Sequence, residues 1–391
     1  MPRRELATSA SLVSNAVAAL APQVVALLLL SPAQFAVFSL LFVALGLVQS
    51  AQNSLVVDPW LRHDIHKSVL PVMPVVWAAV VLAGVAASIP VALSFVEPTD
   101  FWLSAAGLLL AQTRNSLRLI AVASSWRAPL ISDCLFIVGL TSVLAGTSWN
   151  GLTWSDLWLG IVLGSALGTA PWLMHVRSAT LVPWRWFVER RRDIASLWLE
   201  STILDLGVAG PPLAFAKFMA PADFAVVRAA TSALLPVRLI LLPLRAKIAG
   251  QRPAALRSGP HLLWLVALSL VIGTGTGVGL LLVGSWSFAG GGVLPLLRSY
   301  ALEVALMAAL QLLGTTFYLA SRVHCRPRRL LVTRLADTAQ QIVVLAVTFI
   351  VGGLSGTVWG YVVFSAVSVA LWWLALGPSR RGDGRPLAQP A

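Results

Sequence analysis

Long uncharged apolar runs, separated by short polar connections, constrain this chain more than any other feature. The first extends from Leu6 to Leu30, and runs of comparable length recur to the end of the sequence. About 20 apolar residues in a helix cross the hydrocarbon core of a bilayer. Charged residues make up 11% of the chain, against about 25% in an average soluble domain. The sequence therefore predicts an all-α membrane protein, because a helix satisfies its own backbone hydrogen bonds in lipid.

We expect twelve membrane-spanning helices. The first follows Arg3 and Arg4 and in that respect is similar to a secretory signal peptide. Its apolar run is too long for a signal peptide and takes part in an internal repeat, so we assign it as the first span. The expected spans are residues 6–30, 35–57, 70–95, 101–124, 128–144, 157–176, 194–216, 224–244, 261–283, 300–319, 338–353 and 357–376.

An internal repeat divides these spans into two groups of six. The sequence PAQFAV at residues 32–37 returns as PADFAV at residues 221–226, at an offset of 189 residues. At the same offset Pro22 corresponds to Pro211, so each copy carries two prolines ten residues apart. A repeat of this kind is typical of a chain built from two related structural units.

The distribution of Arg and Lys predicts the orientation of the spans. Four of the six connections that follow an odd-numbered span contain neither residue, and the other two contain one each, Lys217 and Arg298. Cytoplasmic loops are enriched in Lys and Arg, and the remaining connections hold nearly all of them. We therefore expect both termini in the cytoplasm. An even number of spans per half makes the halves parallel.

The expected fold class is an all-α polytopic membrane protein with about twelve transmembrane helices in two parallel six-helix repeats. We expect an N-terminal bundle (1–180), a basic aromatic cytoplasmic linker (181–193), a C-terminal bundle (194–377) and a disordered cytoplasmic tail (378–391). The linker suits either a simple connection or a helix lying at the membrane interface, because it combines tryptophan with several arginines.

Several functional classes are disfavoured. The net charge of +13 is spread over connections between spans rather than over one domain, which argues against nucleic-acid binding. Cys134 lies in a span and Cys325 in a basic loop, so we expect neither a disulfide nor a metal site. The expected outer connections are too short for the loop or domain that enzymes acting on lipid-linked sugars need. We therefore expect no enzyme activity and no cofactor.

A glycine-rich stretch, GTGTGVG at residues 273–279, is superficially similar to a nucleotide-binding loop. It lacks the GxGxxG spacing and lies inside an apolar span. Small residues in a transmembrane helix are typical of close helix packing or of a bend, and this is the interpretation we favour.

Arginines at membrane depth are the main candidates for function, because each such charge costs roughly 3 kcal/mol to place there and usually faces a protein interior or an aqueous cavity. Arg114 and Arg118 lie on one face of the fourth span, and Arg228 lies in the eighth. We interpret them as lining a cationic cavity for a phosphate or pyrophosphate. The alternative is structural, with Arg118 extending to the inner interface and salt bridges neutralising the others. If Arg114 and Arg228 are unpaired, replacing either by Ala should leave folding intact.

Other polar side chains would complete this cavity. Glu200 and Asp205 in the seventh span are candidates either for binding a coupling cation or proton, or for pairing with the arginines. Four amides of the first two spans are assigned to the substrate-binding cavity: Gln23, Gln49, Gln52 and Asn53.

Two passages resemble bacterial polysaccharide flippases of the multidrug/oligosaccharidyl-lipid/polysaccharide (MOP) superfamily. The first is PAQFAVFS at residues 32–39, followed after the second span by DPWLR at residues 58–62. The second is QTRNSLR at residues 112–118, followed by WRAPLISD at residues 126–133. The two-repeat plan is similar over nearly the whole chain. The resemblance implies a MATE/MOP-like fold and transport of lipid-linked oligosaccharides or small cationic compounds by alternating access.

From these features we expect a transporter that flips a lipid-linked anionic oligosaccharide or polysaccharide precursor across the bacterial cytoplasmic membrane. Its expected partners are this substrate, membrane lipids and polysaccharide-assembly proteins, and no nucleic acid. Two alternatives remain open. One is a cation-coupled drug exporter with an acidic cavity around Glu200 and Asp205, and the other is a non-transporting scaffold in a polysaccharide-assembly complex.

Overall fold

The computed structural model describes residues 2–63, 72–122, 127–147, 151–173, 187–234, 237, 241, 253–284, 292–325 and 327–377. Within these ranges every regular element is a helix. Six helices among them are long and apolar enough to cross a membrane: Pro32–Trp60, Val72–Ala92, Arg127–Thr147, Gly259–Val283, Ala301–Ser321 and Arg328–Ala375. The prediction of an all-α polytopic membrane protein is confirmed.

The helices follow the expected spans in chain order. In the first half they are α1 (Pro2–Leu29), α2 (Pro32–Gln52), α4 (Val72–Ala92), α5 (Phe101–Val122), α6 (Arg127–Thr147) and α7 (Trp154–Leu173). In the second half they are α9 (Arg191–Val208), α10 (Gly210–Phe218), α11 (Pro221–Ser232), α14 (Gly259–Val283), α16 (Ala301–His324) and α17 (Pro327–Ala375). The shorter segments are the π-helix η1 (Asn53–Val57), α3 (Asp58–His63), η2 (Pro98–Asp100), α13 (Pro253–Leu256) and α15 (Leu294–Arg298).

The two copies of the repeated motif have the same local structure. Pro32 begins α2 and Pro221 begins α11, and a proline is favoured at this position because the first N–H groups of a helix have no intrahelical partner. Phe35 and Phe224 lie in the first turn of these helices, and both are buried. The correspondence predicted from the repeat therefore holds at the start of both helices.

Helix breaks shape the seventh span and the boundary between the eleventh and twelfth spans. The seventh span is divided into α9 and α10, with Pro211 at the start of the second helix. The eleventh and twelfth spans together form α17, which breaks at Gly353 where the backbone has φ 56° and ψ −131°. This left-handed conformation is accessible to glycine because it has no Cβ. Gly356 and Gly360 beyond the break lie against Thr348 before it, so the chain folds back as a helical hairpin.

The described residues belong to two compact units. Unit 1 is drawn from residues 1–232 and 280–299, and unit 2 from residues 233–279 and 300–391. The bundle boundaries expected from the sequence stay a prediction. The tail at 378–391 and residues 181–186 of the linker lie outside the described residues.

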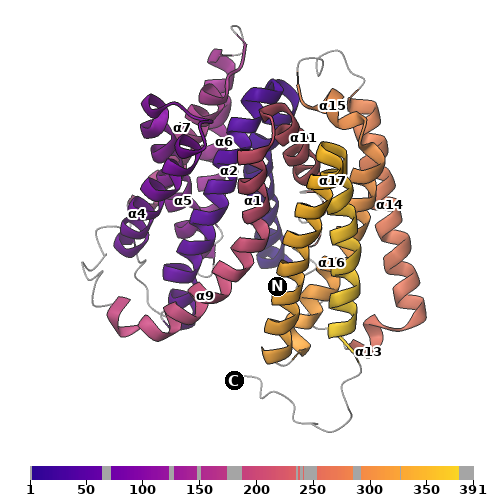
Figure 1. Ribbon diagram of the computed structural model, residues 1–391. Helices are drawn as coiled ribbons and strands as arrows, with labels where there is room; N and C mark the ends of the chain where they lie inside the picture. The colour runs from indigo at the N-terminus through magenta and orange to yellow at the C-terminus, as the bar shows by residue number, and fades with distance from the viewer. Residues whose placement is uncertain are drawn as a thin grey trace. The chain divides into compact units, whose positions relative to one another are not determined.

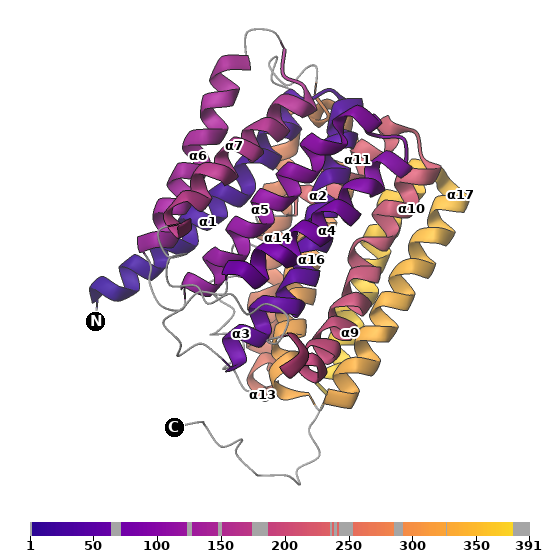
Figure 2. The same ribbon diagram turned by 90° about the vertical axis from the view of Figure 1, so that its left-hand side faces the viewer.

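In unit 1, α2 packs against α4, α5, α7, α9 and α11 (Figures 1 and 2). The α6 and α7 helices approach each other closely at Gly139 and Gly164. A Cβ on Gly139 would lie 2.6 Å from the Cα of Gly164, which leaves no room for a side chain. Since α1 also packs on α6 and α7, the polar residues of α1, α5 and α6 are held near one another.

In unit 2, α16 packs against α17, and α14 approaches α16 through the glycine-rich stretch. A Cβ on Gly273 would lie 2.6 Å from the carbonyl oxygen of Ala305, and one on Gly277 would lie 3.0 Å from the Cβ of Ala305. These glycines permit close helix packing, as the sequence interpretation proposed.

Candidate functional site

The main candidate site is a charged cluster inside unit 1, where α1, α5 and α6 meet. Asp133 on α6 is fully buried between Arg114 and Arg118 of α5. Its Oδ1 accepts hydrogen bonds from Arg114 Nη2 at 2.5 Å and from Arg118 Nε at 2.9 Å. Its Oδ2 accepts from Arg118 Nε at 3.0 Å and from the hydroxyl of Ser14 on α1 at 2.7 Å. Three helices therefore converge on one carboxylate.

Helix geometry and a small residue on α7 accommodate Arg114 in this cluster. Its side chain passes Gly168, where a Cβ would lie 2.8 Å from Arg114 Cδ. The guanidinium donates from Nε to Ser132 Oγ at 3.3 Å and lies over the ring of Phe136, 4.4 Å from its centroid. Arg114 is 4% exposed, so its charge is satisfied inside the unit rather than by solvent.

The cluster bears on the condition that Arg114 is unpaired and on the alternative that Arg118 extends to the inner interface, and it meets neither. Arg114 is paired with Asp133, so its removal would leave a buried carboxylate with one arginine fewer. Arg118 does not extend to the inner interface, because its guanidinium binds the same carboxylate in the interior. Both arginines share the carboxylate of Asp133. The sequence passages 112–118 and 126–133 meet here, and Asp133 is the member that the sequence analysis did not assign to the site.

A second polar region lies at the end of α2 and in η1. Gln52 is fully buried and donates from Nε2 to the carbonyl oxygen of Val75 on α4 at 2.9 Å. The buried side-chain oxygens of Gln52 and Asn53 accept no hydrogen bond from the described part of the chain. Buried polar atoms of this kind usually bind water or a ligand, and π-helical turns often occur at functional sites. Gln49 on α2 and Gln23 on α1 are half-buried.

The remaining predicted residues are distributed over α9 and α11. Asp205 on α9 is partly buried and lies near Ser50 of α2, where the seventh span contacts the polar end of the second. Arg228 on α11 is half-buried, and its Nη1 donates to Thr231 Oγ1 at 3.4 Å. The side chain of Glu200 lies outside the described part of the structure.

Unit 2 contains a buried acidic residue that the sequence analysis missed. Asp337 on α17 accepts a hydrogen bond from Trp372 Nε1 at 3.1 Å and lies 3.9 Å from Arg334 Nη1. Arg334 also donates to the hydroxyl of Tyr318 at 3.2 Å, and its guanidinium lies over the ring of that residue. The sequence contained a signal for this site, because Asp337 is an acidic residue directly before the expected eleventh span.

The fold and the site together define a polytopic membrane protein with ion pairs buried among its helices. No protein-family model and no curated protein sequence matches the chain. Among solved structures it is similar to the lipid II flippase MurJ in an inward closed conformation, with a TM-score of 0.63 and 12% sequence identity. The match covers 97% of this chain and 88% of that one. The resemblance to the MOP superfamily, of which MurJ is a member, is therefore confirmed at the level of the fold.

Two MATE transporters, also of this superfamily, show weaker similarity. The Vibrio cholerae MATE transporter VcmN has a TM-score of 0.47 and 10% identity, over 95% of this chain and 94% of that one. The eukaryotic MATE transporter AtDTX14 has a TM-score of 0.43 and 11% identity, over 95% of this chain and 90% of that one.

Proposed function

We propose that this protein is a transporter of the bacterial cytoplasmic membrane that flips a lipid-linked anionic glycan precursor to the outer leaflet by alternating access. The observation that carries the proposal is an excess of arginine at membrane depth in a chain with the fold of a lipid II flippase. Arg114 and Arg118 share one carboxylate, and Arg228 adds a further cation to unit 1. A phosphate-linked headgroup needs such a cation wherever it crosses the hydrocarbon region.

We assign different roles to these arginines. Arg228 is half-buried, so its guanidinium can bind the phosphate or pyrophosphate when the cavity opens. The Arg114–Arg118–Asp133 cluster supplies a positive field, and Asp133 keeps both guanidinium groups in position. The side-chain oxygens of Gln52 and Asn53 are suited to accept hydrogen bonds from sugar hydroxyls. Gln23 and Gln49 belong to the same proposed cavity.

Transport against a gradient needs an energy source, and Asp205 is our candidate for coupling. Its carboxylate lies near Ser50 at the contact between α9 and α2. Neutralisation of that carboxylate by a proton or cation would change the electrostatics of the contact between the two helices. Glu200, five residues earlier on the same helix, is the second candidate.

The direct test measures flipping of a lipid-linked oligosaccharide in vesicles that contain the purified protein. We expect Arg228→Gln to lower the flipping rate about tenfold or more, equivalent to ~1.4 kcal/mol of lost stabilisation, while its melting temperature stays close to that of the wild type. The matched control is Arg298→Gln, because Arg298 is exposed on α15. Wild-type flipping by the Arg228→Gln variant would remove this residue from the site. Failure of the wild type to flip lipid-linked glycans of several structures would favour the scaffold alternative.

A cation-coupled exporter is the second candidate, and the partly buried Asp205 is the observation that favours it. An exporter of cationic compounds needs an acidic cavity rather than a basic one. Efflux of a cationic dye from vesicles distinguishes the two. If Asp205→Asn abolishes dye efflux and Arg228→Gln does not, the exporter replaces the flippase.

A further inference from the structure

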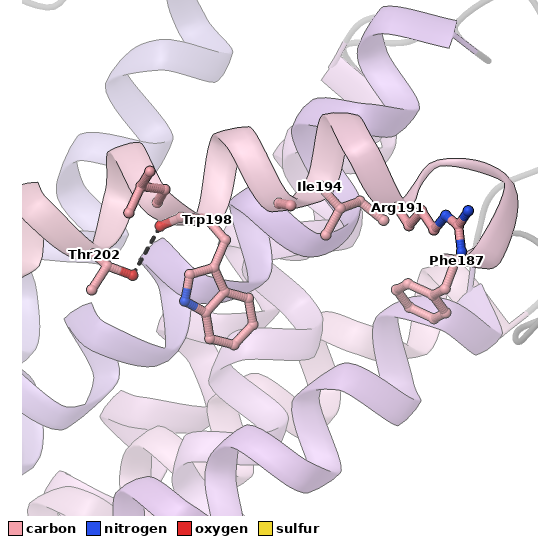
Figure 3. Close-up of a pocket in the computed structure, with 7 residues that line it drawn as sticks. Phe187, Arg191, Ile194, Trp198 and Thr202 are labelled. Carbon is pink, nitrogen blue, oxygen red and sulfur yellow. Dashed lines mark hydrogen bonds between the residues drawn. The ribbon is translucent and has the colours of Figure 1, made fainter. Parts of the chain in front are cut away.

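An open groove runs along one side of α9 in unit 1. It has a volume of about 590 Å³, and its lining in the described part of the chain is Phe187, Arg191, Ile194, Ala195, Trp198, Leu199 and Thr202. Figure 3 shows Arg191, Ile194, Trp198 and Thr202 following one another along the helix, with Phe187 just before its start. Ile194 is buried at 9% exposure, whereas Trp198 is 43% and Leu199 64% exposed. The groove therefore has a buried floor and apolar sides that are open to whatever surrounds the helix.

The groove is positively charged at one end and apolar along most of its length. Arg191 lies at the beginning of α9, and the face that follows it is apolar as far as Thr202. The Thr202 hydroxyl donates to the carbonyl oxygen of Trp198 at 2.9 Å, so it is already bonded within the helix (Figure 3). A suitable ligand is consequently an amphiphile with an anionic group at one end and a hydrocarbon chain at the other.

The length of the groove fits one leaflet. A rise of about 1.5 Å per residue places Arg191 and Thr202 about 16 Å apart along the helix axis, and half of a hydrocarbon core of about 30 Å is about 15 Å. A single acyl chain can therefore follow the groove from the interface to the bilayer centre.

Charge identifies the leaflet. Arg190, Arg191 and Arg192 are consecutive at the start of α9, in the connection that the Arg and Lys distribution assigns to the cytoplasm. Glu189 lies 3.7 Å from Arg190 and thus interacts with a neighbour of Arg191. The cytoplasmic leaflet carries the anionic lipids that attract basic segments.

We propose that this groove binds one anionic phospholipid of the cytoplasmic leaflet, with its phosphate on Arg191 and one acyl chain along Ile194 and Trp198. The lipid is a bound component of the membrane and not the transported substrate, so the inference does not depend on the proposed transport function. Arg192 supplies an internal comparison, because it is exposed on the same helix but does not line the groove.

The test uses native mass spectrometry of the purified protein with dioleoyl phosphatidylglycerol or dioleoyl phosphatidylcholine. We expect the wild type to retain phosphatidylglycerol preferentially and Arg191→Gln to retain it about fivefold less, while Arg192→Gln behaves as wild type. Trp198→Ala should also reduce retention. Should that variant fail to fold, Leu199→Gln replaces it, because Leu199 is highly exposed and its substitution places an amide on the side of the groove.

Three results would overturn the proposal. Equal losses in Arg191→Gln and Arg192→Gln would indicate diffuse attraction to a basic segment rather than a site. Equal retention of the two phospholipids by the wild type would exclude headgroup recognition. Displacement of phosphatidylglycerol from the wild type by an equimolar lipid-linked oligosaccharide would show that the groove holds the substrate instead.

Discussion

At the scale of single residues, Asp133 determines what the arginines of the fourth span can do. Its carboxylate binds Arg114, Arg118 and Ser14 at once. A buried ion pair is favourable only when hydrogen bonds replace the lost hydration, and breaking one by removing a partner is strongly destabilising. The same cluster therefore supports the fold of unit 1 and holds in position two of the arginines on which the proposed function depends.

Substitution of Asp133 should be more damaging than substitution of either arginine. Asp133→Asn removes the carboxylate that two buried guanidinium groups share, and we expect a loss of about 3–5 kcal/mol in the free energy of unfolding. Arg114→Gln leaves the pair of Asp133 and Arg118 intact, so a smaller loss of about 1–3 kcal/mol is expected. Thermal melts of the purified variants measure the order. Glu97→Gln, at an exposed acidic residue, is the control, and a smaller effect of Asp133→Asn than of Arg114→Gln would contradict the assignment.

At the scale of helices, the cluster depends on how closely α6 and α7 can pack. Gly139 and Gly164 bring the two backbones together, while Gly168 one turn further along α7 leaves space for Arg114. In lipid, helices gain nothing from burying apolar surface against each other, so close van der Waals contact through small residues is a main source of association. A cluster that joins α1, α5 and α6 is therefore maintained in part by glycines that carry no charge.

A single added methyl group tests this contact. Gly139→Ala places a Cβ 2.6 Å from the backbone of Gly164, and because a backbone cannot move aside as a side chain does, we expect a loss of about 1–3 kcal/mol in stability. Gly146→Ala is the matched control on the same helix, since a Cβ there meets nothing within 4 Å. That control should be neutral or stabilising by up to about 1 kcal/mol, because alanine favours the helix. Equal melting temperatures for the two variants would argue against close α6–α7 packing.

At the scale of the whole molecule, the fold and the orientation in the membrane rest on different observations. The similarity to MurJ concerns the fold alone. The orientation comes from the Arg and Lys residues in alternate connections, which predict cytoplasmic termini.

Cysteine labelling in intact cells tests that orientation. In a background where Cys134 and Cys325 are replaced, Pro98→Cys should react with an impermeant maleimide, whereas Arg328→Cys should react only after the cells are permeabilised. Both positions are suitable because both residues are exposed. Labelling of position 328 in intact cells would reverse the assigned orientation. A cysteine at position 150 is expected to behave like one at 98, and one at 190 like one at 328.

The sequence by itself determined the all-α membrane class and the start of each copy of the repeated motif. Lipid offers no hydrogen-bond partners, so an apolar run of sufficient length has to form a helix wherever it lies in the fold. The prolines at 22, 32, 211 and 221 likewise act locally through their missing N–H groups. These properties depend on neighbours in sequence and can therefore be derived from the sequence.

Only the tertiary structure decided which polar groups are partners. Asp133 is 15 and 19 residues from its two arginines and 119 residues from Ser14, and Asp337 is 35 residues from Trp372. The sequence placed Arg114 and Arg118 on one face of a helix, but the partner of that face depends on which helices pack together and at what distance. That distance is determined by side-chain volume at contacts such as Gly139 with Gly164. The periodicity of a single helix does not show which residues of another helix it will contact.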